Sequence, residues 1–160
     1  MQLFELLHPS PQFKAMLVTS HADALARSLA EYLKGLNGSM DLSLYPGEHE
    51  TVASEQISRT DTIKDYRAPL RCGTREYEAV LLHDILDRHE MPLKLLQLVY
   101  RAMENSAEIV VIQRKGSADP YEIEQMIEKA EFRAVNTIGD ILEGYDVIVA
   151  KKMHMWGNGL

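Results

Sequence analysis

Cysteine is nearly absent from this sequence, and long apolar runs are absent altogether. Cys72 is the only cysteine among 160 residues, which excludes an internal disulfide and fits a reducing compartment. No apolar stretch approaches the roughly 20 residues that span a bilayer, and Met1 to His8 lacks the basic and apolar regions of a secretion signal. We therefore expect a cytoplasmic protein with no membrane partner.

Basic residues are also scarce. The chain has 17 Lys and Arg against 24 Asp and Glu, a formal net charge of −7, which argues against charge-driven binding to nucleic acid. Five cations between Arg59 and Arg75 form one locally basic segment, interpreted as a solvated loop or as a surface for an anionic small molecule. With 46% hydrophobic and 26% charged residues, positions 1–160 predict one ordinary globular domain.

The best-defined part of the chain is its centre. An apolar run rich in valine and leucine is closed by His83 and Asp84, which predicts a buried strand whose carboxyl end meets water. Apolar residues at helical spacing follow from Pro92 to Met103, then a break at 104–107, then a second apolar run at 109–112. Strand, crossover helix and strand form a unit that is parallel and right-handed.

The remaining elements continue this alternation of strands and helices. Ser20 is the predicted N-cap of a helix that ends at Gly35, and residues 40–45 alternate as a half-buried strand. Two strands near the end of the chain share a connection so short that they should pair antiparallel. The further predictions are a short helix within 1–13, strands at 14–19, 132–138 and 145–151, helices at 48–58 and 121–131, and a strand near Ile63 or at 67–72.

This order predicts an α/β fold: a doubly wound, mostly parallel sheet with helices on both faces and a C-terminal antiparallel hairpin. Ligands of such sheets bind in the crevice at the carboxyl ends of the strands, where His83 and Asp84 are expected. A neutral histidine suits proton transfer there. The simpler interpretation is that the two residues cap the strand and the following turn.

The residues around this strand resemble a known family. Residues 68–86 are similar to the region around the fourth strand of class I S-adenosylmethionine-dependent methyltransferases, where a proline-containing segment, a glycine-containing turn and an aromatic-acidic pair precede an apolar strand. The resemblance implies a Rossmann-like fold, S-adenosylmethionine as cofactor and methyl transfer to an unidentified small molecule, with His83 and Asp84 as catalytic residues and His83 also beside the cofactor. Further similar segments are the Pro92 helix, 108–113, the Pro120 helix with Ala130-Glu131-Phe132, and 144–152.

The first half departs from the family's pattern. Thr19, Ser20 and His21 stand where the family has a glycine-rich turn, so their side chains and the helix N-terminal amides would meet a ligand's carboxylate, or would only cap the helix. Tyr45 replaces the acidic residue at the end of strand two and would stack on adenine or pack on the sheet edge. Asp65 is the candidate for the polar position near adenine. The resemblance thus implies a trimmed member of the family.

Three alternatives stay open. A non-catalytic protein could keep this fold as a binding or dimerisation module, which the missing glycines favour. His83 and Asp84 could ligate a metal with Asp87 and His89, but such His-Asp pairs lie on helices in metal-dependent phosphohydrolases, so we expect no metal. Residues 154–156 could cover a sheet edge or form a contact in a homodimer. The enzyme and the non-catalytic module differ in one expected feature: only the enzyme needs room for a nucleoside beside the turn after strand one.

Overall fold

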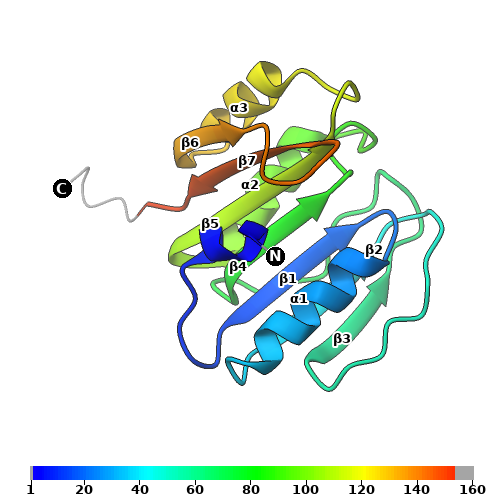
Figure 1. The fold of residues 1–160 in the computed structure, drawn as a ribbon. Coiled ribbons are helices and arrows are strands. Elements are labelled where there is room, and N and C mark those ends of the chain that lie inside the picture. The colour runs from blue at the N-terminus through cyan, green and yellow to red at the C-terminus, as the bar shows by residue number, and fades with distance from the viewer. Residues whose placement is uncertain (1, 154–160) are drawn as a thin grey trace.

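The computed structural model describes residues 2–153 and shows a seven-stranded sheet in the order β3-β2-β1-β4-β5-β7-β6 (Figure 1). Neighbouring strands from β3 to β5 are parallel, and β7 pairs antiparallel with both β5 and β6. This confirms the predicted doubly wound fold with its C-terminal antiparallel hairpin. The strands are β1 (Lys14–Thr19), β2 (Ser39–Leu44), β3 (Ile57–Thr62), β4 (Tyr77–His83), β5 (Met103–Arg114), β6 (Arg133–Ile138) and β7 (Tyr145–Lys151); the helices are η1 (Gln2–Leu7, 3-10), α1 (Ala24–Lys34), α2 (Pro92–Ala102) and α3 (Pro120–Lys129).

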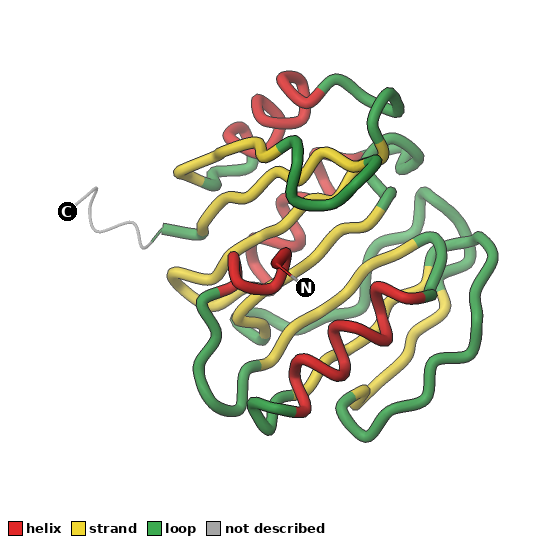
Figure 2. Tube along the Cα trace, viewed as in Figure 1, coloured by secondary structure: helices red, strands yellow, loops and turns green. Residues whose placement is uncertain are grey.

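Helices cover both faces of the sheet, because the side chains of each strand alternate between them. Leu17 and Leu81 face one core, with η1 and α1. Val18 and Val80 face the other, with α2 and α3. The tube view shows α1 and α2 on opposite sides of the sheet (Figure 2). Burial on both sides explains the continuous apolar runs in β1, in β4 and at 109–112 of β5.

Strand β2 is buried rather than half-buried, so that prediction was wrong. It lies between β1 and β3, and Asp41 and Ser43, expected to face water, are 3% and 1% exposed. The Asp41 carboxylate accepts a hydrogen bond from the Tyr77 hydroxyl at 2.6 Å. A partner within the core thus offsets the cost of burying this carboxylate.

Three other sequence predictions were wrong. No helix forms at 48–58; that segment is a loop leading into β3, an edge strand with mostly exposed side chains. The predicted break at 104–107 lies inside β5, whose register shifts there. Ser20 does not cap α1, because its hydroxyl lies 3.4 Å from the Asp84 carbonyl, whereas the Asp23 carboxylate accepts the Leu25 N–H at 3.1 Å.

Several predictions were correct to within two residues, including the three C-terminal elements and the end of α1 at Gly35. The strand expected near Ile63 is β3, while 67–72 holds no strand. Within residues 2–153 no helix is long and apolar enough to cross a membrane. The predicted contact by residues 154–156 lies outside the described residues.

Candidate functional site

The carboxyl edge of the sheet joins the turn after β1 to the end of β4. These strands are neighbours, and Thr19 pairs with His83 in their register. Five of the seven predicted site residues therefore lie together: Thr19, Ser20, His21, His83 and Asp84. Parallel pairing of two strands that are far apart in sequence produces this cluster, in which His83 and Asp84 are 3% and 2% exposed.

The Thr19 hydroxyl organises the turn. It donates to the His21 carbonyl at 3.0 Å and accepts the His21 backbone N–H at 3.1 Å. It also lies 3.1 Å from Nδ1 of His83. The Thr19 hydroxyl has one proton, which it donates to the His21 carbonyl, so Nδ1 of His83 must be the donor in their hydrogen bond. The Nε2 atom of His83 therefore carries a lone pair.

His21 has the same tautomer for a similar reason. Its Nδ1 lies 3.1 Å from the Ser20 hydroxyl, which donates to the Asp84 carbonyl at 3.4 Å. The ring therefore donates through Nδ1, and its Nε2 also carries a lone pair. The two imidazoles pack with their centroids 4.3 Å apart. Burial, and secondly the neighbouring His21, lower the pKa of His83 to about 4, so this ring is neutral at pH 7.

Asp84 follows β4 in a left-handed backbone conformation, with φ of 54°. Aspartate tolerates this region better than most residues, and the Asp84 N–H is bonded to the Ile112 carbonyl at 2.9 Å. Its Oδ1 accepts the Arg114 backbone N–H at 2.9 Å. Its Oδ2 is buried and has no hydrogen-bond partner in the described part of the chain. It lies 3.6 Å from Nε2 of His21 and from Nε2 of His83, and 3.7 Å from the Arg114 guanidinium.

Tyr45 and Asp65 form a separate group with Tyr66. The Tyr45 ring is fully buried and stacks on Tyr66 with centroids 5.2 Å apart, and its hydroxyl donates to the Ala68 carbonyl at 2.9 Å. Asp65 accepts the backbone N–H groups of Arg67 and Ala68, both at 2.9 Å, and the Arg67 amide is the main cause of its lowered pKa. Both side chains thus have structural partners in the loop after β3.

A pocket of about 680 Å³ opens in front of the turn after β1, and we call it the histidine pocket. His21 forms part of its wall, and His83 and Asp84 lie behind His21. Acidic and basic side chains share its rim. The lining residues are Ser20, His21, Ala22, Asp23, Gly47, Glu48, His49, Glu50, Arg88 and Arg114.

One wall of the histidine pocket is the loop after β2, which contacts the turn after β1 directly. A Cβ on Gly47 would lie 1.8 Å from the Ser20 carbonyl oxygen, so only glycine allows this approach. His49 accepts the Ala22 N–H through Nδ1 at 2.9 Å and donates through Nε2 to the Tyr45 carbonyl at 2.7 Å. The loop after β2 thus packs directly against the backbone of the turn after β1.

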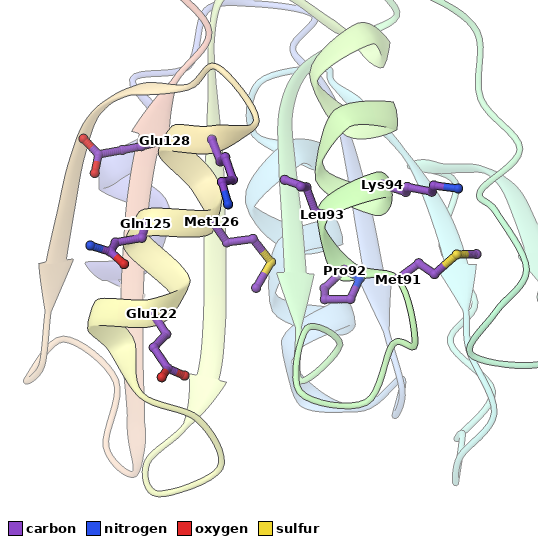
Figure 3. A pocket seen from close by; sticks show the side chains of 9 residues that line it. Met91, Pro92, Leu93, Lys94, Glu122, Gln125, Met126 and Glu128 are labelled. Carbon is purple, nitrogen blue, oxygen red and sulfur yellow. The ribbon is translucent and has the colours of Figure 1, made fainter.

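A larger cavity, of about 810 Å³, lies between α2 and α3, and we call it the helix groove. Figure 3 shows Leu93 and Met126 pointing into it from the two helices. Lys94, Glu122 and Glu128 are also among its lining residues. Within residues 2–153 the single group of His, Cys, Asp or Glu side chains close enough to share an ion is His21, His83 and Asp84, outside this groove.

Sequence reasoning missed Arg88, Arg114 and His49 as pocket residues. A positional signal existed for Arg114, because it follows the apolar run of β5 and so ends at the same sheet edge as His83. No comparable signal marks Arg88 or His49, which are positioned by loops. The metal alternative grouped His83 and Asp84 with Asp87 and His89; in the described residues His83 and Asp84 lie close to His21 instead.

The strand order, the reversed β7 and the polar crevice at the carboxyl edge define the class I S-adenosylmethionine-dependent methyltransferase fold. Comparison with solved structures agrees. An S-adenosylmethionine-dependent methyltransferase from Aquifex aeolicus superposes with a TM-score of 0.73 at 12% identity, covering 95% of this chain and 88% of that one. A TehB-like S-adenosylmethionine-dependent methyltransferase from Corynebacterium glutamicum superposes with a TM-score of 0.69 at 9% identity. The match covers 94% of this chain and 85% of that one.

Longer methyltransferases share the same domain. Human N-acetylserotonin methyltransferase, solved in complex with S-adenosylmethionine, gives a TM-score of 0.62 at 19% identity, and the matched region covers 88% of this chain and 48% of that one. No family model matches the sequence, and no curated protein matches it. The fold is therefore established by structure, at identities too low to carry over a substrate.

Proposed function

We propose that this protein binds S-adenosylmethionine in the histidine pocket and transfers its methyl group to a small molecule. The observation that carries the proposal is the position of this pocket, at the carboxyl ends of β1 and β4 in a methyltransferase fold. Open α/β sheets bind their ligands in such crevices. The pocket volume of about 680 Å³ also lies within the range of small-molecule sites, roughly 300–1,000 Å³.

The charges on the rim suit a zwitterion. Arg88 and Arg114 would attract the carboxylate of the methionine part, and Asp23 and Glu48 would attract its ammonium group. When bound, S-adenosylmethionine supplies an electrophilic methyl group. The protein's own contribution is to hold an acceptor atom in line with that group, and such positioning supplies most of the rate in reactions of this kind.

His21 is the residue best placed to remove the acceptor's proton. It lines the pocket, its Nε2 has a lone pair, and the Asp84 carboxylate 3.6 Å away would stabilise the imidazolium that forms. As the acceptor–carbon bond forms, the sulfur–carbon bond breaks and the proton passes to His21. His83 packs against His21 and does not line the pocket, so its role would be to position the His21 ring.

The test is calorimetric titration with S-adenosylmethionine and S-adenosylhomocysteine after removal of any copurified ligand. Glu48→Trp should fill the pocket and weaken binding by about tenfold or more, since Glu48 is an exposed loop residue of the lining. Glu55→Trp is the matched control, exposed on the same loop but outside the lining. Absence of saturable binding at millimolar ligand, together with no thermal shift, would falsify the proposal.

One observation favours the second candidate, a non-catalytic module. The Ala22 amide is already bonded to His49, and Gly47 lies against Ser20, so part of the turn is covered by the chain itself. A protein of this kind would leave S-adenosylmethionine unbound and would show the same histidine pocket. The titration above therefore distinguishes the two candidates directly.

A further inference from the structure

Three potential metal ligands converge at the inner wall of the histidine pocket. The Nε2 atoms of His21 and His83 each lie 3.6 Å from Oδ2 of Asp84, and all three atoms lie within 4.8 Å of one another. They come from the turn after β1 and the end of β4, whose pairing fixes their relative positions. The site is therefore built by the sheet and not by a single flexible loop.

The hydrogen bonds around this cluster turn all three lone pairs inward. Thr19 and Ser20 engage Nδ1 of His83 and of His21, which leaves both Nε2 atoms as acceptors. Asp84 Oδ1 accepts the Arg114 amide, and Oδ2 has no hydrogen-bond donor among residues 2–153 although Asp84 is 2% exposed. Three acceptors facing one another in a buried site repel, and a carboxylate oxygen buried without a partner is costly. A bound cation would remove both penalties.

We propose that His21, His83 and Asp84 bind one divalent transition-metal ion of the zinc type through two imidazole nitrogens and one carboxylate oxygen. Two imidazoles with one carboxylate are a donor set that zinc and ferrous iron accept. Thr19 and Ser20 would fix the tautomers of the two rings, as partners of metal-ligating histidines commonly do. This assignment rests on the cluster alone and does not require that S-adenosylmethionine binds.

The geometry needs only a small closure. Zinc bonds to nitrogen and oxygen are about 2.0–2.2 Å long, so neighbouring ligand atoms around the ion lie closer than the separations seen here. His21 is on a turn with its side chain 22% exposed, so its ring can move toward the other two. Arg114 is the competing cation, 3.7 Å from Asp84 Oδ2, but its side chain is 57% exposed and can turn into solvent.

Three protein ligands leave an open coordination position, as in catalytic zinc sites. Because His21 borders the histidine pocket, that position would be available to a ligand entering from it. An ion there would lower the pKa of a coordinated hydroxyl group, whose proton would then pass to solvent water in the pocket, because His21 as a metal ligand could no longer accept it. Asp84 and His83 lie behind His21 and do not line the pocket, so they would affect a ligand there by holding the metal ion.

The test begins with protein stripped by a chelator and uses Co²⁺ and Zn²⁺ as probes, without S-adenosylmethionine. Wild-type protein should bind one Co²⁺, seen as visible d–d absorption, and Zn²⁺ should displace it. Asp84→Asn and His21→Gln should each weaken binding by about 100-fold or more, because even changes next to metal ligands cost roughly 10–100-fold. His8→Gln is the control, an exposed histidine paired with Glu108 in the middle of β5 and outside the cluster.

The outcomes are separable. Loss of binding in His21→Gln, with circular dichroism and melting temperature of the metal-free variant unchanged, supports the site even where Asp84→Asn fails to fold. Lack of one-to-one binding by wild-type protein overturns it, as does binding that both variants retain. Failure of the S-adenosylmethionine titration leaves the metal result untouched, since the two experiments share no ligand.

Discussion

The histidine pocket and the helix groove differ in size and in chemistry, and the smaller of the two holds the reactive groups. The helix groove, of about 810 Å³, has Leu93 and Met126 pointing into it and charges at its edge. The histidine pocket, of about 680 Å³, is backed by the half-buried His21 ring, the buried His83 ring and an Asp84 oxygen that has no hydrogen-bond partner within residues 2–153. Volume measures only the room for a ligand, whereas unused lone pairs show where binding energy is available.

The two cavities also differ in how their walls are built. Loops after β1, β2 and β4 meet around the histidine pocket, where backbone contact and side-chain hydrogen bonds fix them. Two helices form the helix groove, and their partly exposed side chains pack without hydrogen bonds between them in the described part of the chain. Substitutions should therefore cost more at the histidine pocket than at the helix groove, and three substitutions test that expectation.

The largest effect is expected at Gly47. A methyl group there would lie 1.8 Å from the Ser20 carbonyl oxygen, so the loop must move away and the His49 to Ala22 bond must lengthen. Gly47→Ala should lower the free energy of unfolding by about 3 kcal/mol, measured by urea titration. The control is Gly139→Ala, whose Cβ meets only the Asp146 carboxylate at 3.9 Å and should cost less than about 0.5 kcal/mol. Equal stabilities for the two variants would mean that the loop is not held against the turn.

The next effect is expected at Thr19, which is fully buried. Valine has the same shape but no hydroxyl, so Thr19→Val leaves His83 Nδ1 and the His21 carbonyl without their partner. The loss should be about 2 kcal/mol in the free energy of unfolding, since buried polar groups then lack partners. Thr60→Val, on the exposed side of edge strand β3, is the control and should change stability little. A loss no larger than the control's would contradict the role assigned to this hydroxyl.

Most of the fold could be predicted from local patterns in the sequence. Buried parallel strands carry continuous apolar runs, and Pro92 marks the start of α2 by backbone chemistry that does not depend on the rest of the protein. The end of α1 at Gly35 was also predicted, although Gly35 has a right-handed conformation with φ of −65° that other residues can adopt. The wrong predictions arose where tertiary contacts outweigh the local pattern of apolar and polar residues. Asp41 looks solvent-facing in the sequence because its partner, the Tyr77 hydroxyl, is 36 residues away.

The site could be predicted only in part, for the same reason. The apolar run placed His83 and Asp84 at the end of a strand, and resemblance to a family marked Thr19 in the turn after the first strand. The pairing of β1 with β4, seen in the structure, brings them together. That both histidines turn Nε2 toward Asp84 follows from hydrogen bonds to hydroxyls, which no spacing in the sequence reveals. Tyr45 was proposed for adenine, but its ring stacks on Tyr66, contributed by the loop after β3.

The smallest effect is expected in the helix groove. Met126 is partly buried on α3 and packs at the edge of the core, so Met126→Ala should lower the free energy of unfolding by about 1 kcal/mol, below the usual cost for a buried methionine. Binding of Co²⁺ and of S-adenosylmethionine should stay within twofold of wild type, because Met126 does not line the histidine pocket. Urea unfolding and the two titrations measure this on one preparation. If Met126→Ala weakened the binding of either ligand by much more than twofold, that ligand would belong to the helix groove, and volume would have been the better guide.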